Sequence, residues 1–414
     1  MMKLTFFIFF LTFNICAQDD LATAHFHDLV TRYQLGPVKD QSFCYMENDK
    51  LIGYRQNKLQ RIASLTKLFT TFLASENLDL NQSFRTTFYV SKDWLHIEGS
   101  EDPYFEEEKL LLLFKALNEL GHHQFKKVTF SEKFHFYDLA MGSYLDITST
   151  ESLKRLNHYL NRKNQVEVNQ KWKTVIKFAL EEGVQLLPDA PSLSADQVFV
   201  ENNFKGSDEF TAYTHDSKKL YSLLKTMNVQ SKNFVSENIF KMASKVKTID
   251  ALLLEKEISK DSFMIKNGSG LPILSGVKRM DNLSTCETVL KVMNLLVESM
   301  KKHNILLSEI LAVNGGLDFG SFRERFKDFP ETFQSVLAKT GTLKNTSSLA
   351  GILLTSVQRP FAILNHTSRT EAARRFQDHF VAKLFDLIGP SQPLVYQKIS
   401  IFPWDETPFL NPEN

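Results

Sequence analysis

Apolar side chains recur along this chain with two different periods, and these periods predict where helices and strands lie. Residues 20–33 gather their apolar positions on one side, which predicts an amphipathic helix. Residues 42–46 and 51–54 alternate between apolar and polar positions across a short polar turn, so they predict a β-hairpin.

The last third of the chain shows the same two patterns in the opposite order. Residues 335–340, 349–355 and 361–365 predict three strands separated by turns. Residues 370–387 then predict a long helix. Helix, two strands, three strands and helix are therefore the expected outline of one domain.

Residues 64–75 predict a buried helix. Its apolar side chains repeat at the helical spacing of about 3.6 residues: Leu65, Leu68, Phe69, Phe72 and Leu73. Ser64 would open this helix, and Lys67 would follow on the same face, because positions i and i+3 are neighbours on a helix surface.

Residues of about 80–205 interrupt the outline and predict a small inserted domain. Strands are expected at residues 84–90, 94–97 and 127–130, and a helix at residues 109–120. From Pro390 onward the chain is punctuated by proline, which predicts a tail.

The composition favours a large core without a strongly charged surface. Hydrophobic residues make up 43% of the 414 positions and phenylalanines number 35, enough for more than one lobe. Lysine and arginine number 49 against 48 acidic side chains. No charge excess therefore favours binding to nucleic acid or to an anionic surface.

The first residues are typical of a secretory signal peptide. Two methionines and Lys3 precede an apolar run through Phe13, which is too short to span a bilayer comfortably. We expect residues 1–17 to be removed and no transmembrane anchor to remain. A lipoprotein cysteine at Cys16 is a weaker alternative, because Phe13 and Asn14 fit a lipobox badly.

Cleavage would leave two cysteines, Cys44 and Cys286. They could pair in an oxidising compartment, but nothing in the sequence brings them together, so we expect two buried thiols. The histidine pairs that begin at His25 and His122 lack the further spacing that completes a metal site. We therefore expect neither a metal nor another cofactor.

Three short motifs follow one another in a defined order. They are Ser64-Leu65-Thr66-Lys67, Ser231-Lys232-Asn233 and Lys339-Thr340-Gly341. The first pattern, S-x-x-K, is weak alone, because it recurs at Ser222 with Lys225, Ser244 with Lys247, Ser275 with Lys278 and Ser299 with Lys302. The order is more specific, since S-x-x-K, S-x-N and K-T-G supply three walls of one acyl-transfer site.

The first motif predicts a nucleophile and its base. A serine hydroxyl is a poor nucleophile at neutral pH unless a neighbouring group accepts its proton. Lys67 is the candidate base for Ser64, and burial together with a second cation, Lys339, would lower the pKa of Lys67. Ser64 would also lie at a helix N-terminus, where the backbone dipole favours negative charge.

The second motif predicts a proton relay and an amide clamp. On a loop or extended turn, Ser231 and Asn233 would point the same way. Ser231 would pass a proton between Lys67 and the leaving group, while the Asn233 amide would hold a substrate carbonyl and the lysine. Two further S-x-N frames, at Ser75 and Ser236, remain alternatives, but a helical run follows the preferred frame.

The third motif predicts substrate binding on an edge strand. Lys339 would attract the terminal carboxylate of a substrate, and Thr340 and Thr342 would hydrogen-bond it. Gly341 would let a ligand backbone approach closely. The backbone N–H groups of Ser64 and Thr342 are the expected oxyanion-hole pair.

With these motifs the chain resembles the penicillin-binding protein 4 type of D-alanyl-D-alanine carboxypeptidases and endopeptidases, serine peptidase family S13. Four segments add to the resemblance: residues 99–103 (G-G-G-D-P in the family), 267–271 (D-G-S-G-L), 320–325 (G-T-L-x-x-R) and 339–343 with 349–351 (K-T-G-T-L and L-A-G). Lys232 stands where the family is usually acidic. Asn267 replaces an aspartate, which predicts a looser turn.

The resemblance implies an α+β protein with the penicillin-binding protein and serine β-lactamase-like fold. This fold has a five-stranded antiparallel sheet flanked by helices, with a helical lobe and here a small inserted domain. The catalytic domain would comprise residues 18–80 and 205–390. Residues 81–204 would form the inserted domain, reduced relative to the family, and residues 391–414 a C-terminal tail.

The resemblance also implies a periplasmic hydrolase that cleaves peptidoglycan stem peptides and cross-links through an acyl-enzyme on Ser64. Lys67 would be the general base, and β-lactams would trap the same serine as covalent inhibitors. A trimmed insertion would leave the cleft open to cross-linked wall, so we expect endopeptidase activity beside carboxypeptidase activity. A protein inhibitor is a speculative further partner.

Two rival functions remain open. A serine β-lactamase on the same scaffold would need a water-activating group, but Leu153 stands at the glutamate position of an E-x-x-L-N pattern that ends in Leu156 and Asn157. A catalytically inactive wall-binding module is suggested by Lys232 and Asn267. Against it, every side chain that the chemistry needs is present.

Overall fold

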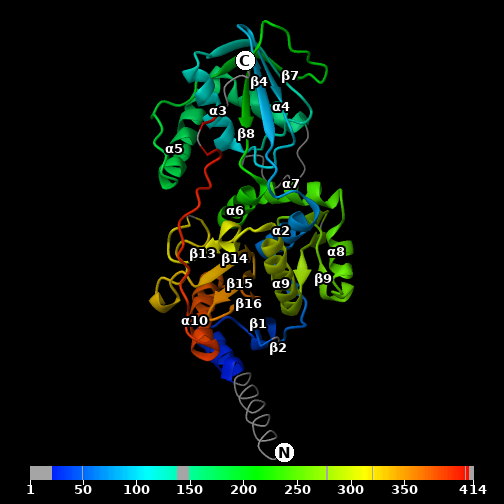
Figure 1. The fold of residues 1–414 in the computed structure, drawn as a ribbon, viewed down its shortest axis with the longest axis vertical. Coiled ribbons are helices and arrows are strands. Elements are labelled where there is room, and N and C mark those ends of the chain that lie inside the picture. The colour runs from blue at the N-terminus through cyan, green and yellow to red at the C-terminus, as the bar shows by residue number, and fades with distance from the viewer. Residues whose placement is uncertain are drawn as a thin grey trace, which may run out of the picture. The chain divides into compact units, whose positions relative to one another are not determined.

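The chain forms two compact units, shown in Figure 1. The computed structural model describes residues 21–48, 50–137, 149–276, 278–318, 320–405 and 407–409. The first unit consists of the chain up to Leu78 together with Leu224–Ile399, and the second of Asp79–Leu223 together with the residues from Ser400 onward. The predicted signal peptide lies outside the described residues.

The first unit is built on a six-stranded antiparallel sheet. Its strands, in spatial order, are β13 (Ala312–Val313), β14 (Val336–Leu343), β15 (Thr346–Leu354), β16 (Gln358–Asn365), β1 (Gln41–Glu47) and β2 (Lys50–Tyr54). The sheet thus has one strand more than the five predicted. The additional strand, β13, has only two residues and therefore gives no periodic pattern in the sequence. It pairs with Leu337 and Ala338 alone.

Helices pack on this sheet and extend into a helical lobe. They are residues 21–32, α2 (Thr66–Asn77), α6 (Leu220–Gln230), α7 (Asn233–Ser244), α8 (Ile249–Glu255), α9 (Cys286–His303) and α10 (Thr370–Ile388). Short strands complete the unit: β3 (Gln60–Arg61), β12 (Leu283–Ser284) and β9 (Phe263–Met264) in one sheet, and β10 (Ile273–Ser275) with β11 (Lys278–Met280) in another. The predicted terminal helices and the five predicted strands are confirmed.

Neighbouring residues of β1 show how the two faces of the sheet are covered. The Phe43 ring packs against Phe26 and against Phe380 of α10, with ring centroids 4.6 and 4.8 Å apart. Successive side chains of a strand point to opposite faces. Cys44 accordingly meets Cys286, the first residue of α9, on the other face.

Cys44 and Cys286 form a disulfide, with Cα atoms 6.0 Å apart. The expectation of two buried thiols is therefore wrong. The two cysteines are 242 residues apart in sequence, and only the packing of α9 against the sheet brings them together.

The second unit contains a five-stranded mixed sheet. Its spatial order is β7 (Ser194–Val200), β6 (Gln124–Phe130), β5 (Trp94–Glu98), β4 (Arg85–Val90) and β8 (Thr211–Asp216). The pairs β5·β6 and β6·β7 are parallel, and β4 is antiparallel to both of its neighbours. Apolar side chains of α3 (Glu107–Glu119), α4 (Ser149–Tyr159) and α5 (Gln165–Glu181) fill its core.

The predicted domain boundaries differ from these units at two points. The inserted domain was expected to end at residue 204, but β8 pairs with β4 from Thr211 to Asp216, so the second unit extends to Leu223. The expected tail is divided between the units. Residues up to Ile399 belong to the first, whereas Phe402 is 3% exposed in the core of the second.

None of the helices within the described residues is long and apolar enough to cross a membrane.

Candidate active site

Ser64 lies at the entry to α2, on a short 3₁₀ turn, η2 (Ala63–Leu65). The serine is partly exposed, whereas Ala63 and Leu65 on either side of it are buried. The first ten residues of α2, from Thr66 to Ser75, are all buried. The apolar stripe that predicts this helix therefore fixes it in the core, and the helix presents Ser64 at its N-terminal end.

Lys67 is fully buried and reaches Ser64. Its Nζ lies 3.3 Å from the Ser64 Oγ, 2.8 Å from the Asn233 Oδ1 and 2.9 Å from the backbone oxygen of Ser269. None of these partners carries a charge, and Lys67 forms no ion pair with any described residue. Burial in the first place, and then the charge of Lys339, lower the pKa of Lys67 well below its ordinary value, against an opposing effect of Glu237.

The second motif lies where α6 ends and α7 begins. Ser231 has a left-handed backbone with φ of 57°, and Asn233 is the first residue of α7. Ser231 and Lys232 lie between the two helices, where a loop or extended turn was predicted, and only Asn233 is helical. This turn sends the two side chains to different lysines: the Ser231 Oγ accepts a hydrogen bond of 3.1 Å from Lys339, and Asn233 contacts Lys67.

Lys339 is the second buried lysine of the site. It is 1% exposed on β14, and its Nζ donates to the Ser231 Oγ and, at 3.0 Å, to the backbone oxygen of Thr340. Burial lowers the pKa of Lys339 to about 7. Because no described carboxylate pairs with Lys339, its charge near neutral pH is available to an anionic ligand.

Gly341 is where the third motif meets the serine turn. A Cβ at this position would lie 2.6 Å from the backbone oxygen of Ile62 and 3.1 Å from the backbone nitrogen of Leu65. Real Cβ atoms do not tolerate the shorter contact, so only glycine lets β14 approach η2 this closely. The approach brings together the segments of Ser64 and Thr342, the predicted oxyanion-hole residues.

The two threonines of the third motif contact other segments. The Thr340 Oγ1 donates to the Ser321 Oγ at 2.9 Å. Thr342 is exposed, and its Oγ1 accepts a hydrogen bond of 3.3 Å from Arg374 of α10. The threonine pair therefore extends the site towards Ser321 and α10.

The loop at residues 267–271 supplies a contact that sequence reasoning missed. The Ser269 carbonyl accepts the hydrogen bond from Lys67. The backbone around it is fixed by Glu237 of α7, whose carboxylate accepts from the Ser269 N–H at 2.8 Å and from the Gly268 N–H at 3.1 Å. The Ser236 hydroxyl donates to the Gly268 carbonyl at 2.6 Å. The alternative S-x-N frame at Ser236 thus supports the loop.

Asn267 closes the turn of this loop. Its Oδ1 accepts from the Gly270 N–H at 3.0 Å and from the Asn282 amide at 2.9 Å, while its Nδ2 donates to the Leu271 carbonyl at 2.7 Å. The looser turn predicted at this position is not found, because the amide of Asn267 bonds on both sides. The remaining S-x-N frame, at Ser75, lies at the end of α2, where Ser75 bonds to Ser299.

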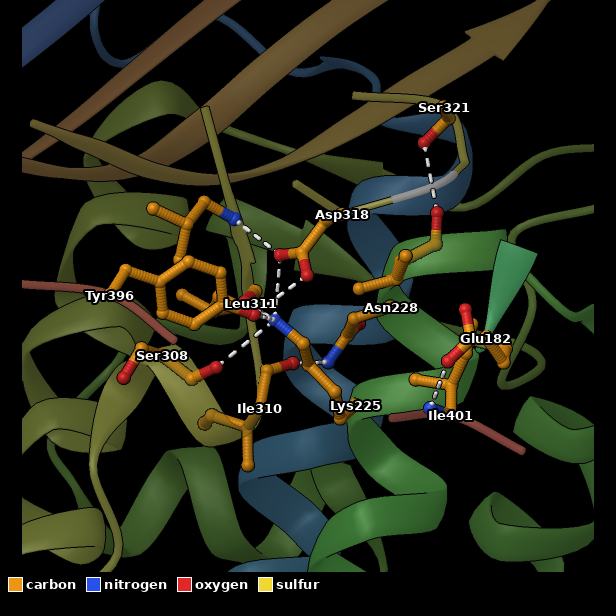
Figure 2. A network of polar contacts seen from close by, with 12 residues as sticks. Glu182, Lys225, Asn228, Ser308, Ile310, Leu311, Asp318, Ser321, Tyr396 and Ile401 are labelled. Atoms are coloured by element: carbon orange, nitrogen blue, oxygen red, sulfur yellow. Dashed lines mark hydrogen bonds and ion pairs between the residues drawn. The ribbon is translucent and has the colours of Figure 1, made fainter. Parts of the chain in front are cut away.

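A third buried lysine, Lys225 of α6, lies in the network of Figure 2. Its Nζ forms an ion pair of 2.7 Å with Asp318 and donates to the Leu311 carbonyl at 2.7 Å and to the Tyr396 hydroxyl at 3.0 Å. Asp318 also accepts from the Tyr396 hydroxyl at 2.6 Å and from the Val313 N–H at 2.8 Å. Lysine and carboxylate are both almost completely buried.

This network adjoins the site at two points. Lys225 lies on α6, which ends directly before Ser231. Asp318 lies three residues before Ser321, whose N–H donates to the Val229 carbonyl at 3.2 Å and whose hydroxyl bonds to Thr340. The Lys225–Asp318 pair therefore connects the supports of the second and third motifs.

Comparison with known protein families finds a match to part of the chain. Residues 194–384 match the sequence model of the D-Ala-D-Ala carboxypeptidase 3 (S13) family. Over these residues the chain is similar to the S13 peptidases. The match includes the second and third motifs and the loop at residues 267–271, while Ser64 and Lys67 precede it. No curated protein sequence matches this chain.

Solved structures show the same fold. Bd3459, a predatory peptidoglycan endopeptidase from Bdellovibrio bacteriovorus, is 23% identical with a TM-score of 0.76, over 90% of this chain and 98% of that one. Bd0816, a predatory endopeptidase from the same organism, is 24% identical with a TM-score of 0.74, over 89% and 98%. Penicillin binding protein 4 (dacB) from Haemophilus influenzae is 17% identical with a TM-score of 0.55, over 88% and 99%. The predicted penicillin-binding protein-like fold is confirmed.

Proposed function

We propose that this protein is a periplasmic D-Ala-D-Ala carboxypeptidase and endopeptidase of the S13 type, which hydrolyses stem peptides and cross-links of peptidoglycan through an acyl-enzyme on Ser64. One observation supports the proposal above all others. The buried Lys67 amine touches the Ser64 hydroxyl and two neutral oxygens, those of Asn233 and Ser269, without a carboxylate partner.

The donors and acceptors around Lys67 favour a neutral amine that accepts a proton. A neutral amine has two N–H groups and one lone pair. The oxygens of Asn233 and Ser269 can only accept hydrogen bonds, so they occupy both N–H groups. The lone pair then faces the Ser64 hydroxyl, which donates its proton to Lys67 as the oxygen attacks the D-Ala carbonyl.

The later steps use the other two walls. Backbone N–H groups of Ser64 and Thr342 would hold the tetrahedral oxyanion. Lys339, Thr340 and Thr342 would bind the carboxylate of the leaving group. Lys67 would return its proton through Ser231 to the leaving amine, and water would then cleave the ester and restore the Ser64 hydroxyl.

Two relatives of known structure support the expected partners. Bd3459 has been solved acylated by penicillin G and in complex with the immunity protein Bd3460, and Bd0816 in complex with the same immunity protein. We accordingly expect β-lactams to acylate Ser64 here. A protein inhibitor is a second expected partner.

The proposed periplasmic location is supported by the Cys44–Cys286 disulfide. Disulfides form and persist in oxidising compartments, of which the bacterial periplasm is one. The apolar leader predicted for residues 1–17 would bring the chain there.

Mass spectrometry after exposure to penicillin tests the proposal. The parent should gain the mass of one opened penicillin, and Ser64→Ala should gain none. Muropeptide analysis with the same two proteins should show loss of terminal D-Ala and of cross-linked dimers with the parent only. An unlabelled parent would point to the inactive wall-binding module, and rapid nitrocefin turnover to the β-lactamase.

A further inference from the structure

A cavity of about 740 Å³ lies in the first unit beside the third motif. Its walls come from three segments: the end of the helix at residues 21–32, the loop of residues 320–329, and the first half of α10. None of the catalytic steps proposed above uses it.

The charges that line this cavity do not cancel. Three cations are paired: Arg325 with Asp378, Arg374 with Glu371 and Lys327 with Glu324. The side chains of Arg32 and Arg375 line the cavity without a hydrogen bond or ion pair to any residue that the structure describes. Among the carboxylates that line the cavity, only Asp328 likewise has no hydrogen bond or ion pair to a described residue. The cavity therefore has two unpaired cations and one unpaired anion.

The histidine of the cavity adds no charge of its own near neutral pH. Burial first, and then the positive charge of Arg32, lower the pKa of His379. The excess positive charge of the cavity therefore comes from its arginines.

Two contacts connect the cavity to the third motif. Ser321 lines the cavity, and its Oγ accepts the hydrogen bond from Thr340. Arg374 also lines the cavity, and its guanidinium donates to Thr342. A ligand whose carboxylate lies at these threonines thus has the arginine cavity as its next surface.

The proposed chemistry says which part of a substrate arrives there. Lys339 and the threonines bind the carboxylate of the leaving group, so the cavity lies on the leaving-group side. A pentapeptide loses only D-Ala, whose single carboxylate is already bound at the threonines. A cross-link instead releases a whole stem peptide, which carries further carboxylates beyond the scissile bond.

We propose that this cavity is a subsite for an additional carboxylate of the leaving stem peptide, bound by Arg32 and Arg375, and that it favours cross-linked substrates over free pentapeptides. The subsite rests on the function proposed above. Arginine suits this role, because its planar guanidinium binds carboxylates through two parallel hydrogen bonds.

The test is the double variant Arg32→Gln with Arg375→Gln, assayed on three substrates. These are a purified cross-linked muropeptide dimer, the same dimer with only the additional carboxylates of its leaving peptide amidated, and a pentapeptide monomer. We expect kcat/KM for the dimer to fall about ten-fold, mainly through KM, since charged hydrogen bonds to a carboxylate are lost. Cleavage of the monomer should be unchanged, and parent and variant should cleave the amidated dimer equally.

Lys383→Gln is the matched control, because this α10 cation pairs with Asp386 and does not line the cavity. It should leave all three substrates unaffected. Unchanged acylation of the double variant by penicillin shows that it folds. Equal effects on dimer and monomer, or none on either, would overturn the subsite alone. A parent that neither forms the penicillin adduct nor cleaves any substrate would overturn the proposed function and the subsite with it.

Discussion

Lys67 and Lys225 are both fully buried in the first unit, and both end an S-x-x-K pattern, yet their surroundings differ in one respect. Lys225 faces the Asp318 carboxylate at 2.7 Å, so its charge is balanced in the core. Lys67 faces only neutral oxygens and has the cation Lys339 nearby. A buried ammonium is costly unless it is paired.

The comparison teaches that the pairing of a buried lysine, rather than its burial, decides what it does. Where a carboxylate is present, the lysine stays charged and holds segments together. Where only carbonyl oxygens are present, the amine favours its neutral form and is available as a base. The same substitution, lysine to methionine, should therefore have different consequences at the two positions.

The largest expected effect is on acylation by Lys67→Met. Without its base, Ser64 should react with penicillin about 10³-fold more slowly, within the range that general bases contribute. Stopped-flow or quenched-flow acylation kinetics measure this rate. Lys225→Met is the matched control. Its acylation rate should fall less than ten-fold, because Lys225 contacts neither Ser64 nor the other residues of the three motifs. Equal losses of acylation rate in the two variants would contradict the different roles assigned to the two lysines.

The next effect is on stability and should be larger at the other lysine. Lys225→Met leaves the Asp318 carboxylate buried and unpaired, which should lower the free energy of unfolding by about 3–5 kcal/mol. Lys67→Met leaves only neutral acceptors unpaired, so we expect a loss of about 1–2 kcal/mol. Urea denaturation of both variants measures the difference. Adding Asp318→Leu to Lys225→Met should recover most of the loss, and a failure to recover would count against the pairing argument.

The pH dependence should report Lys339. Its pKa of about 7 means that the side chain is charged below this pH and neutral above it. For a pentapeptide with a free terminal carboxylate, kcat/KM should therefore fall about ten-fold per pH unit above about 7, as the cation that binds the carboxylate is lost. Initial rates across pH measure this limb, and a substrate with an amidated terminus should lack it.

The lowered pKa of Lys339 should also affect the free energy of unfolding, in the direction opposite to its effect on activity. The folded pKa of Lys339 lies below its ordinary value of 10.5. Between these two pH values the unfolded chain holds the extra proton, so this group makes stability rise with pH. Activity and stability should thus diverge above neutral pH.

The smallest effect is expected for Glu237→Gln. Glutamine offers one oxygen where the carboxylate accepts from two backbone N–H groups, those of Gly268 and Ser269. The Ser269 carbonyl would be held less firmly against Lys67, and acylation by penicillin should slow about three- to ten-fold, as for the loss of one hydrogen bond to a charged group. Glu255→Gln, in an exposed pair with Lys247, is the control and should have no effect.

Regular patterns in the sequence were sufficient to predict the terminal helices, the main strands and the helix after Ser64. The order of the three motifs also selected Ser64, Lys67 and Lys339. In the structure Lys67 contacts Ser64 of the first motif, and Lys339 contacts Ser231 of the second. These features are local, or are fixed by the residue types that the chemistry needs.

The rest depends on contacts between distant segments. Asp318 is 93 residues from Lys225, and the two paired cysteines are 242 residues apart, so no local spacing in the sequence predicts either contact. The Ser269 contact uses a backbone oxygen, which every residue has. Glu237 follows Asn233 by one helical turn, and this spacing was the only signal that could have suggested it.

The protonation state of Lys67 tests the central claim most directly. Nitrogen NMR of protein labelled at lysine Nζ, with Lys67 assigned by comparison with Lys67→Met, reports whether each buried amine is neutral or charged. At pH 7 we predict a neutral amine for Lys67 and an ammonium for Lys225. An ammonium signal from Lys67 at this pH would contradict the account, because a protonated lysine cannot accept the proton of Ser64.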